Sequence, residues 1–101
     1  MFSIKPLPEF TEWLGSLKDG LTKRRLVARL HKAQLGNLGD TKPVGQGISE
    51  LRIDHGPGYR IYFMKRGSTI IILLCGGDKS SQTNDIQTAK RLAAEWSKEN
   101  D

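Results

Sequence analysis

Residues 51–64 read LRIDHGPGYRIYFM, and this stretch decides the fold. Apolar and polar residues alternate on both sides of the tetrapeptide HGPG, whose glycines and proline are typical of a turn. The stretch therefore predicts a β-hairpin. Successive side chains of a strand point to opposite faces of a sheet. The side chains predicted to share the face toward the core are Leu51, Ile53, Ile61 and Phe63.

The other face of the predicted hairpin is polar and basic. Two arginines beside a tyrosine suit the binding of a phosphodiester, because a guanidinium group can pair with two phosphate oxygens at once. A solvated outer face would show the same pattern, so both interpretations stay open at this point. The side chains on this face are Arg52, Asp54, Arg60, Tyr62 and Met64.

The chain before the hairpin predicts one short strand, at residues 2–5, and two helices. The first helix begins near Pro8, because proline is tolerated in the first turn, and Asp19-Gly20 is expected to break it. A second helix is predicted over residues 22–35, and together the two form a hairpin that covers one sheet face. The apolar positions of the second helix are Leu26, Val27, Leu30 and Ala33.

The sequence predicts a loop before the hairpin and a strand, a second loop and a helix after it. Residues 36–47 are glycine-rich and polar, which favours a long loop. Residues 69–75 are a near-continuous run of β-branched and aliphatic residues, as expected of a central strand buried on both faces. Residues 76–82 are predicted to leave that strand as a loop. The last helix starts near Thr83 or Asn84, with inward positions Ile86, Ala89, Leu92, Ala93 and Trp96.

These elements follow the order β-α-α-β-β-β-α and predict an α+β fold with a mainly antiparallel sheet. The length of 101 residues allows one domain, residues 1–101, with one modest core. The 16 Lys and Arg residues exceed the 11 Asp and Glu residues, giving a net charge of +5 and a pI near 9.6. Such an excess favours an anionic partner, nucleic acid first.

The sequence also bounds the compartment and the cofactors. Its one cysteine, Cys75, lies in the aliphatic run and is predicted to be a small buried residue in a reducing compartment. The N-terminus lacks the apolar segment of a signal peptide and no apolar run is long enough to span a bilayer, so we expect a cytoplasmic protein. Two histidines and one cysteine give no zinc spacing, and no phosphate-binding glycine loop is present, so we expect neither metal nor cofactor.

One chemistry remains compatible with these residues. RNA can be cleaved without metal when its own 2′-OH attacks the adjacent phosphate, which requires a base, an acid and cations. Arg52, Arg60 and Lys79 are the candidate cations. Histidine is the side chain that ordinarily changes charge near neutral pH, so His55 is the candidate acid or base, although a histidine beside a glycine is more often simply a turn residue.

Four further residues are predicted to contact RNA. Tyr59 and Tyr62 could stack on bases. Arg25 and Arg29 form a basic stripe with Lys32 on the second predicted helix, a pattern that also describes the solvated face of a helix.

The chain resembles a known family in three segments: ELRI at residues 50–53, GYRIYF at 58–63 and GGDKSSQ at 76–82. They are similar to the addiction-module killer proteins of the RelE/ParE toxin superfamily, in the HigB-like branch. The similarity covers about residues 10–96. The order of elements derived above is also the order found in that family.

The resemblance implies a toxin of a type II toxin–antitoxin module that cleaves mRNA in the ribosomal A site. It further implies a helix-turn-helix antitoxin that neutralises the toxin in a hetero-oligomer. Matching the family's basic residues to this chain points to Arg52, Arg60 and Lys79, and Arg60 is the firmest match because it lies within the Gly-Tyr-Arg motif. The acid or base stays open, with His55 as a candidate.

Two alternatives share the fold. Some toxins of this fold inhibit DNA gyrase without cutting RNA, and fold alone does not decide function. The second alternative is an inactive module that only binds an antitoxin.

Overall fold

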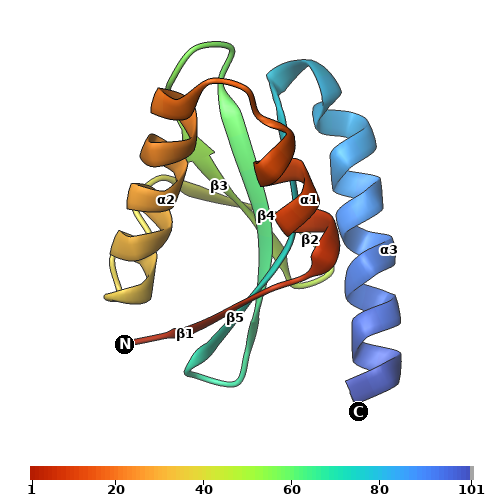
Figure 1. Cartoon of the computed structure of the whole chain (residues 1–101). Coiled ribbons are helices and arrows are strands. Elements are labelled where there is room, and N and C mark those ends of the chain that lie inside the picture. The colour runs from red at the N-terminus through yellow and green to blue at the C-terminus, as the bar shows by residue number, and fades with distance from the viewer. Residues whose placement is uncertain (101) are drawn as a thin grey trace.

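The computed structural model describes residues 1–100, which form a five-stranded sheet with helices on both faces (Figure 1). The strands are β1 (Ser3–Pro6), β2 (Thr41–Gly45), β3 (Ile48–Ile53), β4 (Tyr59–Arg66) and β5 (Ile70–Asp78). The helices are α1 (Pro8–Ser16), α2 (Gly20–Gln34) and α3 (Gln82–Asn100), with the 3-10 turn η1 (Lys79–Ser81) before α3. In the strand order β1-β5-β4-β3-β2, β1 runs parallel to β5 and all other neighbours are antiparallel. The predicted α+β class is confirmed.

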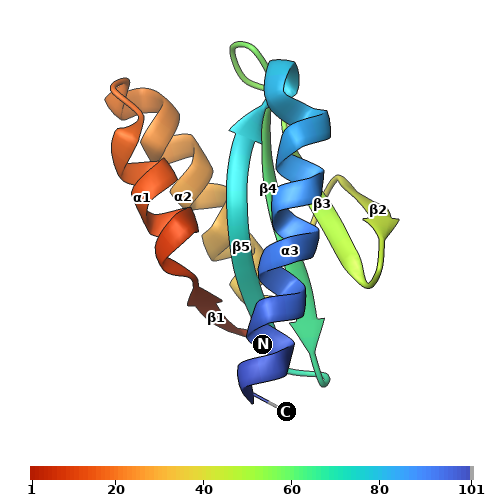
Figure 2. The same ribbon diagram turned by 90° about the vertical axis from the view of Figure 1, so that its right-hand side faces the viewer.

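The β3–β4 hairpin has the register that its alternation predicts. Leu51 pairs with Ile61, and Arg52 pairs with Arg60. α1 and α2 lie together on one face of the sheet and α3 on the other (Figure 2). The apolar face of the hairpin packs beneath α1 and α2 in a cluster made of Phe10, Leu26, Ala33, Leu51, Ile53, Ile61, Phe63, Ile71 and Leu73.

The opposite face is covered by α3 along much of its length, which corrects one sequence prediction. Tyr62 was expected to contact RNA, but its side chain is 0% exposed because α3 packs over it. Burial, together with the charge of Glu50, raises the pKa of Tyr62 well above its usual value. The inward positions predicted for the last helix are confirmed, since Ala89, Leu92 and Ala93 are buried there.

Both predicted loops contain regular structure. The first includes the edge strand β2, which pairs with β3 through Thr41–Leu51 and Lys42–Glu50. Pro43 lies within this strand, and an edge strand tolerates a residue that cannot donate a hydrogen bond. In the second, β5 continues to Asp78 and η1 follows.

The last residues of β5 include Gly76 and Gly77, which have no side chains and therefore allow the strand to lie between α1 and α3. The indole of Trp13 on α1 covers Gly76, and the carboxylate of Asp85 on α3 lies against Gly77, so a Cβ at either glycine would collide with these side chains. Asp85 is held by the Ser81 hydroxyl at 2.5 Å. Burial raises the pKa of Asp85 above its usual value.

The helical hairpin differs from the prediction in detail. α1 ends at Ser16, and Asp19 caps α2 rather than ending α1. Val27 was predicted to face the core but is 51% exposed, because it follows Leu26 by one position and so lies ~100° around the helix. No helical segment within residues 1–100 combines the length and the apolar character that a bilayer span requires.

Candidate functional site

Three parts of the chain meet at one end of the sheet. Figure 1 shows the turn between β3 and β4, the start of α2 and the connection from β5 to α3 at the same end. This end carries the predicted cations, because Arg52 and Arg60 lie directly opposite each other on β3 and β4. Like charges at directly opposite positions of a sheet repel, so such a pair needs a compensating group.

The compensating group is Glu50, a residue that the sequence analysis did not single out as part of the site. Its carboxylate is 1% exposed, and its Oε2 atom lies 2.6 Å from Arg60 Nε and 3.9 Å from Arg52 Nε. The Arg60 N–H does not point at the oxygen, so the contact is an ion pair rather than a hydrogen bond. The side chain of Gln82, at the start of α3, donates to Oε1 at 3.1 Å and to Oε2 at 3.3 Å.

The spacing could have revealed Glu50. It precedes Arg52 by two positions on a strand, so both side chains lie on the same face. The hairpin register then brings Arg60 opposite Arg52. The sequence could therefore have predicted a carboxylate beside the two arginines.

A hollow of about 380 Å³ opens beside the two arginines; we call it the lysine hollow. Arg60 and Lys79 both line this hollow beside Gly58. A Cβ atom at Gly58 would lie 3.5 Å from Arg60 Nη1 and 3.9 Å from Lys79 Cβ, so both side chains are close to this glycine. A side chain at Gly58 would cover this wall, and the φ of +84° also favours glycine. The lining residues are Asp40, Arg52, Ile53, Asp54, Gly56, Pro57, Gly58, Arg60 and Lys79.

A second hollow, of about 310 Å³, lies between α2 and β3; we call it the histidine hollow. It shares Arg52, Ile53 and Asp54 with the lysine hollow. The structure therefore places Arg60 and Lys79 on one side of Arg52 and His55 on the other, so the four predicted catalytic residues line two adjoining hollows. The lining residues of the second are Arg25, Ala28, Arg29, Lys32, Arg52, Ile53, Asp54 and His55.

His55 is held by contacts to two different elements. Its Nε2 atom lies 3.1 Å from the hydroxyl of Thr22 on α2, and that hydroxyl donates to Asp19 Oδ2 at 2.9 Å. The imidazole also stacks on the ring of Tyr59, with centroids 6.5 Å apart and an interplanar angle of 25°. Tyr59, a predicted RNA contact, is half-buried and packs against the core cluster beneath α1 and α2.

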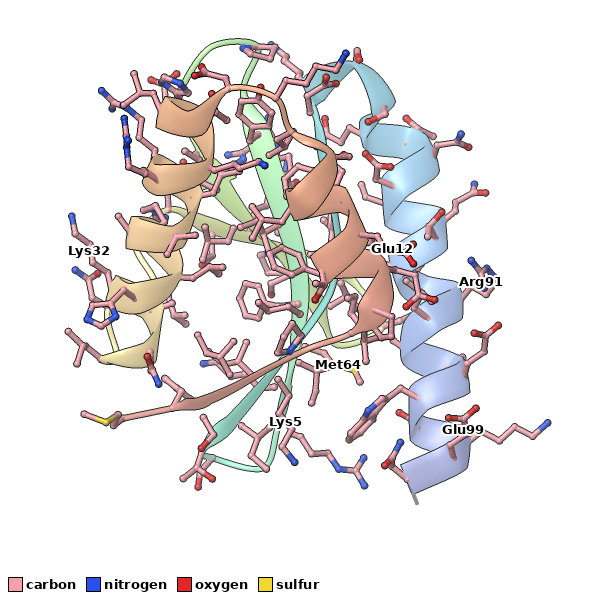
Figure 3. The ribbon with its side chains drawn as sticks, viewed as in Figure 1. Lys5, Glu12, Lys32, Met64, Arg91 and Glu99 are labelled. Atoms are coloured by element: carbon pink, nitrogen blue, oxygen red, sulfur yellow. The ribbon has the colours of Figure 1, made fainter. Side chains whose placement is uncertain are left out.

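The two predicted basic residues of α2 differ in their surroundings. Arg29 donates to the carbonyl of Leu38 at 3.0 Å and to that of Arg52 at 3.4 Å, so its guanidinium ties α2 to β3. Arg25 is exposed at the rim of the histidine hollow. Lys32, also on α2 (Figure 3), lines the histidine hollow as well. Within residues 1–100, no three His, Cys, Asp or Glu side chains gather closely enough to hold a metal ion.

Comparison with known proteins gives two matches. The family model of the phage-derived protein Gp49-like (DUF891) covers residues 12–95. A protein of Haemophilus influenzae (strain Rd), described as uncharacterized, is 50% identical over 92 residues, which make up 91% of this chain and 93% of the relative. The family match includes every residue that lines the two hollows.

Proposed function

The chain belongs to the phage-derived Gp49-like family, a family related to toxin–antitoxin toxins, and we propose that it is a toxin that cleaves mRNA. The proposal includes the finer assignment to the HigB-like branch of the RelE/ParE superfamily. One observation carries it: Arg52 and Arg60 lie side by side at the uncovered end of the sheet, each facing an open hollow and both held by the buried Glu50. Guanidinium groups arranged in this way suit a phosphodiester backbone.

The two hollows suit successive phosphates of one RNA strand. The lysine hollow offers Arg60 and Lys79 to one phosphate, and the histidine hollow offers Arg25 and Lys32 to the next. Arg52 lines both hollows, so it can contact the phosphate at which the strand is cut. Asp40 and Asp54 also line these hollows and would repel phosphates placed against them, which confines the backbone to the basic walls.

The proposed reaction needs the RNA and one titratable side chain. His55 takes the proton of a 2′-OH group, whose oxygen forms a bond to the adjacent phosphorus. The bond from phosphorus to the 5′ oxygen then breaks, and that oxygen leaves with the electron pair and takes a proton from water. Arg52 and the neighbouring Arg60 stabilise the extra negative charge of the phosphorane. The products carry a 2′,3′-cyclic phosphate and a 5′-hydroxyl group.

We further propose that the mRNA is cut on the ribosome and that a helix-turn-helix antitoxin neutralises the toxin. The outer side of α2 supports a partner of acidic, amphipathic character. Val27 and Ala28 form the apolar floor of a shallow groove on that side. The groove is bordered by Lys23, Arg24 and Lys32, which would attract carboxylates.

The test is primer extension on an mRNA in a reconstituted translation system, with and without ribosomes. Cuts at codon boundaries that require ribosomes are expected from the wild-type chain. Arg60→Ala is expected to lower the cleavage rate ~10²–10³-fold, the usual loss of one electrostatic stabiliser, and to abolish growth arrest. Because alanine leaves Glu50 with fewer partners, Arg60→Lys is measured beside it, since lysine keeps the charge but loses the planar fork.

The matched control is Arg91→Ala, which removes the same charge from α3. Arg91 points away from the sheet (Figure 3) and pairs with Glu95 at 3.1 Å. This variant should cleave as the wild type does. Folded Arg60 variants that remain fully active would overturn the site. Intact mRNA from a folded chain that arrests growth would overturn the nuclease proposal, and DNA damage in the same cells would favour inhibition of gyrase.

A further inference from the structure

A chain of hydrogen bonds connects α2 to the turn after β3. The Asp19 carboxylate accepts the backbone N–H of Leu21 at 3.1 Å and the hydroxyl of Thr22 at 2.9 Å. The same Thr22 oxygen lies 3.1 Å from His55 Nε2. Thr22 is buried, so water has little access to the hydroxyl at the middle of this chain.

The chemistry of the three groups fixes the position of each proton. The hydrogen bonds from Thr22 and Leu21 lower the pKa of Asp19 below its usual value, so at neutral pH its carboxylate is charged and can only accept. A threonine hydroxyl has one proton, and it is donated to Asp19. The contact between Thr22 and His55 is then a hydrogen bond only if His55 Nε2 carries a proton and donates it. In the neutral ring the lone pair is therefore on Nδ1.

The remaining contacts fix the plane of the ring and the backbone that carries it. Tyr59 stacks against the imidazole, and Trp13 packs on Tyr59 with centroids 6.3 Å apart. The backbone of the turn is also held, because His55 N–H donates to the Ile53 carbonyl and Gly58 N–H donates to the His55 carbonyl, each at 3.1 Å. Within that plane the contact with Thr22 selects the orientation with Nε2 toward α2, since a ring turned over would present a carbon atom to the hydroxyl.

We propose that Asp19 and Thr22 are positioning residues that hold His55 in its Nε2–H tautomer and leave Nδ1 as the proton acceptor for RNA. The part concerning RNA rests on the proposed function, whereas the tautomer does not. This arrangement gives a single histidine a defined tautomer without a direct carboxylate contact.

The first experiment measures the tautomer by NMR of the ring nitrogens. Long-range ¹H–¹⁵N correlations distinguish a protonated from an unprotonated ring nitrogen. The chain has two histidines, and the exposed His31 on α2 serves as an internal reference. We expect the Nε2–H pattern for His55 in the wild type, a mixture of tautomers in Thr22→Val, and the wild-type pattern restored in Thr22→Ser, which keeps the hydroxyl.

The second experiment compares the cleavage of ribosome-bound mRNA by the same variants. Thr22→Val is expected to lower kcat ~10-fold or more with KM unchanged, since it removes part of the ~10²–10⁴-fold that general base catalysis supplies. Thr22→Ser should restore most of the rate. Thr11→Val, an exposed threonine on α1, is the matched control and should change neither readout. Circular dichroism establishes that each variant is folded, and Asp19→Asn provides a second variant that keeps Thr22.

The outcomes separate the two proposals. If Thr22→Val leaves the His55 tautomer unchanged, the positioning role is overturned whatever the cleavage data show. A changed tautomer with unchanged cleavage also overturns it, because His55 would then not be the base. If the wild type cuts no mRNA but the tautomer depends on Thr22, the proposed function fails and the hydrogen-bonded chain stands.

Discussion

Replacing Glu50 with alanine tests whether one buried carboxylate holds the arginine pair. Removing one partner of a buried ion pair costs ~3–5 kcal/mol, because the other charge stays buried and uncompensated. Here the remaining charges can regain some water, since the Arg60 side chain is 12% exposed and the Arg52 side chain 35%. We therefore expect a loss near the lower limit, ~3 kcal/mol, from a total of ~5–15 kcal/mol for a typical domain.

Urea unfolding followed by tryptophan fluorescence measures this loss, because Trp13 on α1 and Trp96 on α3 report on both faces of the sheet. The control is Glu95→Ala, which removes a carboxylate from a pair whose side chains are 60% and 56% exposed and should cost no more than ~0.5 kcal/mol. Adding Arg60→Met to Glu50→Ala should recover part of the loss, since it removes the uncompensated charge. If Glu50→Ala unfolds at the same urea concentration as Glu95→Ala, the argument that Glu50 neutralises the arginines is refuted.

Three further predictions concern the core. Tyr62→Phe should leave stability unchanged or raise it, because no residue among 1–100 satisfies the buried hydroxyl, and a loss above ~1 kcal/mol in urea would contradict this. Gly77→Ala should cost ~1–3 kcal/mol through its collision with Asp85, whereas Gly15→Ala, placed in open space on α1, should gain ~0.5–1 kcal/mol in thermal unfolding. Burial raises the pKa of Cys75 to about 12 from an ordinary 9.0, so the unfolded thiol ionises first. Stability should therefore fall as the pH rises from 9 towards 12, and a thiol reagent should label only the unfolded chain.

The elements that the sequence predicts well are those with a strong local period. Alternation identifies the β3–β4 hairpin and its faces, and helical spacing identifies the inward positions of α3. Both periods follow from backbone geometry, so they need no knowledge of neighbouring segments. The alternation also predicts that Tyr62 and Arg60 share a face of the sheet. It does not predict that α3 covers Tyr62 and leaves Arg60 accessible, because that depends on where a distant helix packs.

The strand β2 was missed because its local signals oppose its structure. Pro43 lies in its middle, and the turn to β3 consists of Gln46 and Gly47, both with positive φ, of 57° and 78°. Such turns normally carry asparagine or aspartate before the glycine. Pairing with β3 outweighs these preferences, and that pairing is a tertiary contact.

In the candidate site, too, local patterns were predictable and tertiary contacts were not. The opposition of Arg52 and Arg60 could be predicted, because it depends only on the register of one hairpin. Thr22 and Gln82 could not, since they reach His55 and Glu50 from 33 and 32 positions away along the chain. These residues carry hydroxyl and amide groups that occur all over protein surfaces, so only the folded arrangement distinguishes them.

The position at which α3 begins determines what the sheet can offer to a ligand. Tyr62 and Arg60 occupy equivalent positions of the same strand face, yet one is fully buried and the other lines an open hollow. The difference arises at Gln82, where α3 starts and where the same side chain donates to Glu50. We expect a longer η1 connection to withdraw the Gln82 amide from the Glu50 carboxylate, and a shorter one to shift the start of α3 towards the arginines. The three residues of η1 therefore link the packing of the core to the exposure of the site. Insertions after Lys79 should impair the proposed cleavage even though the inserted residues contact no phosphate.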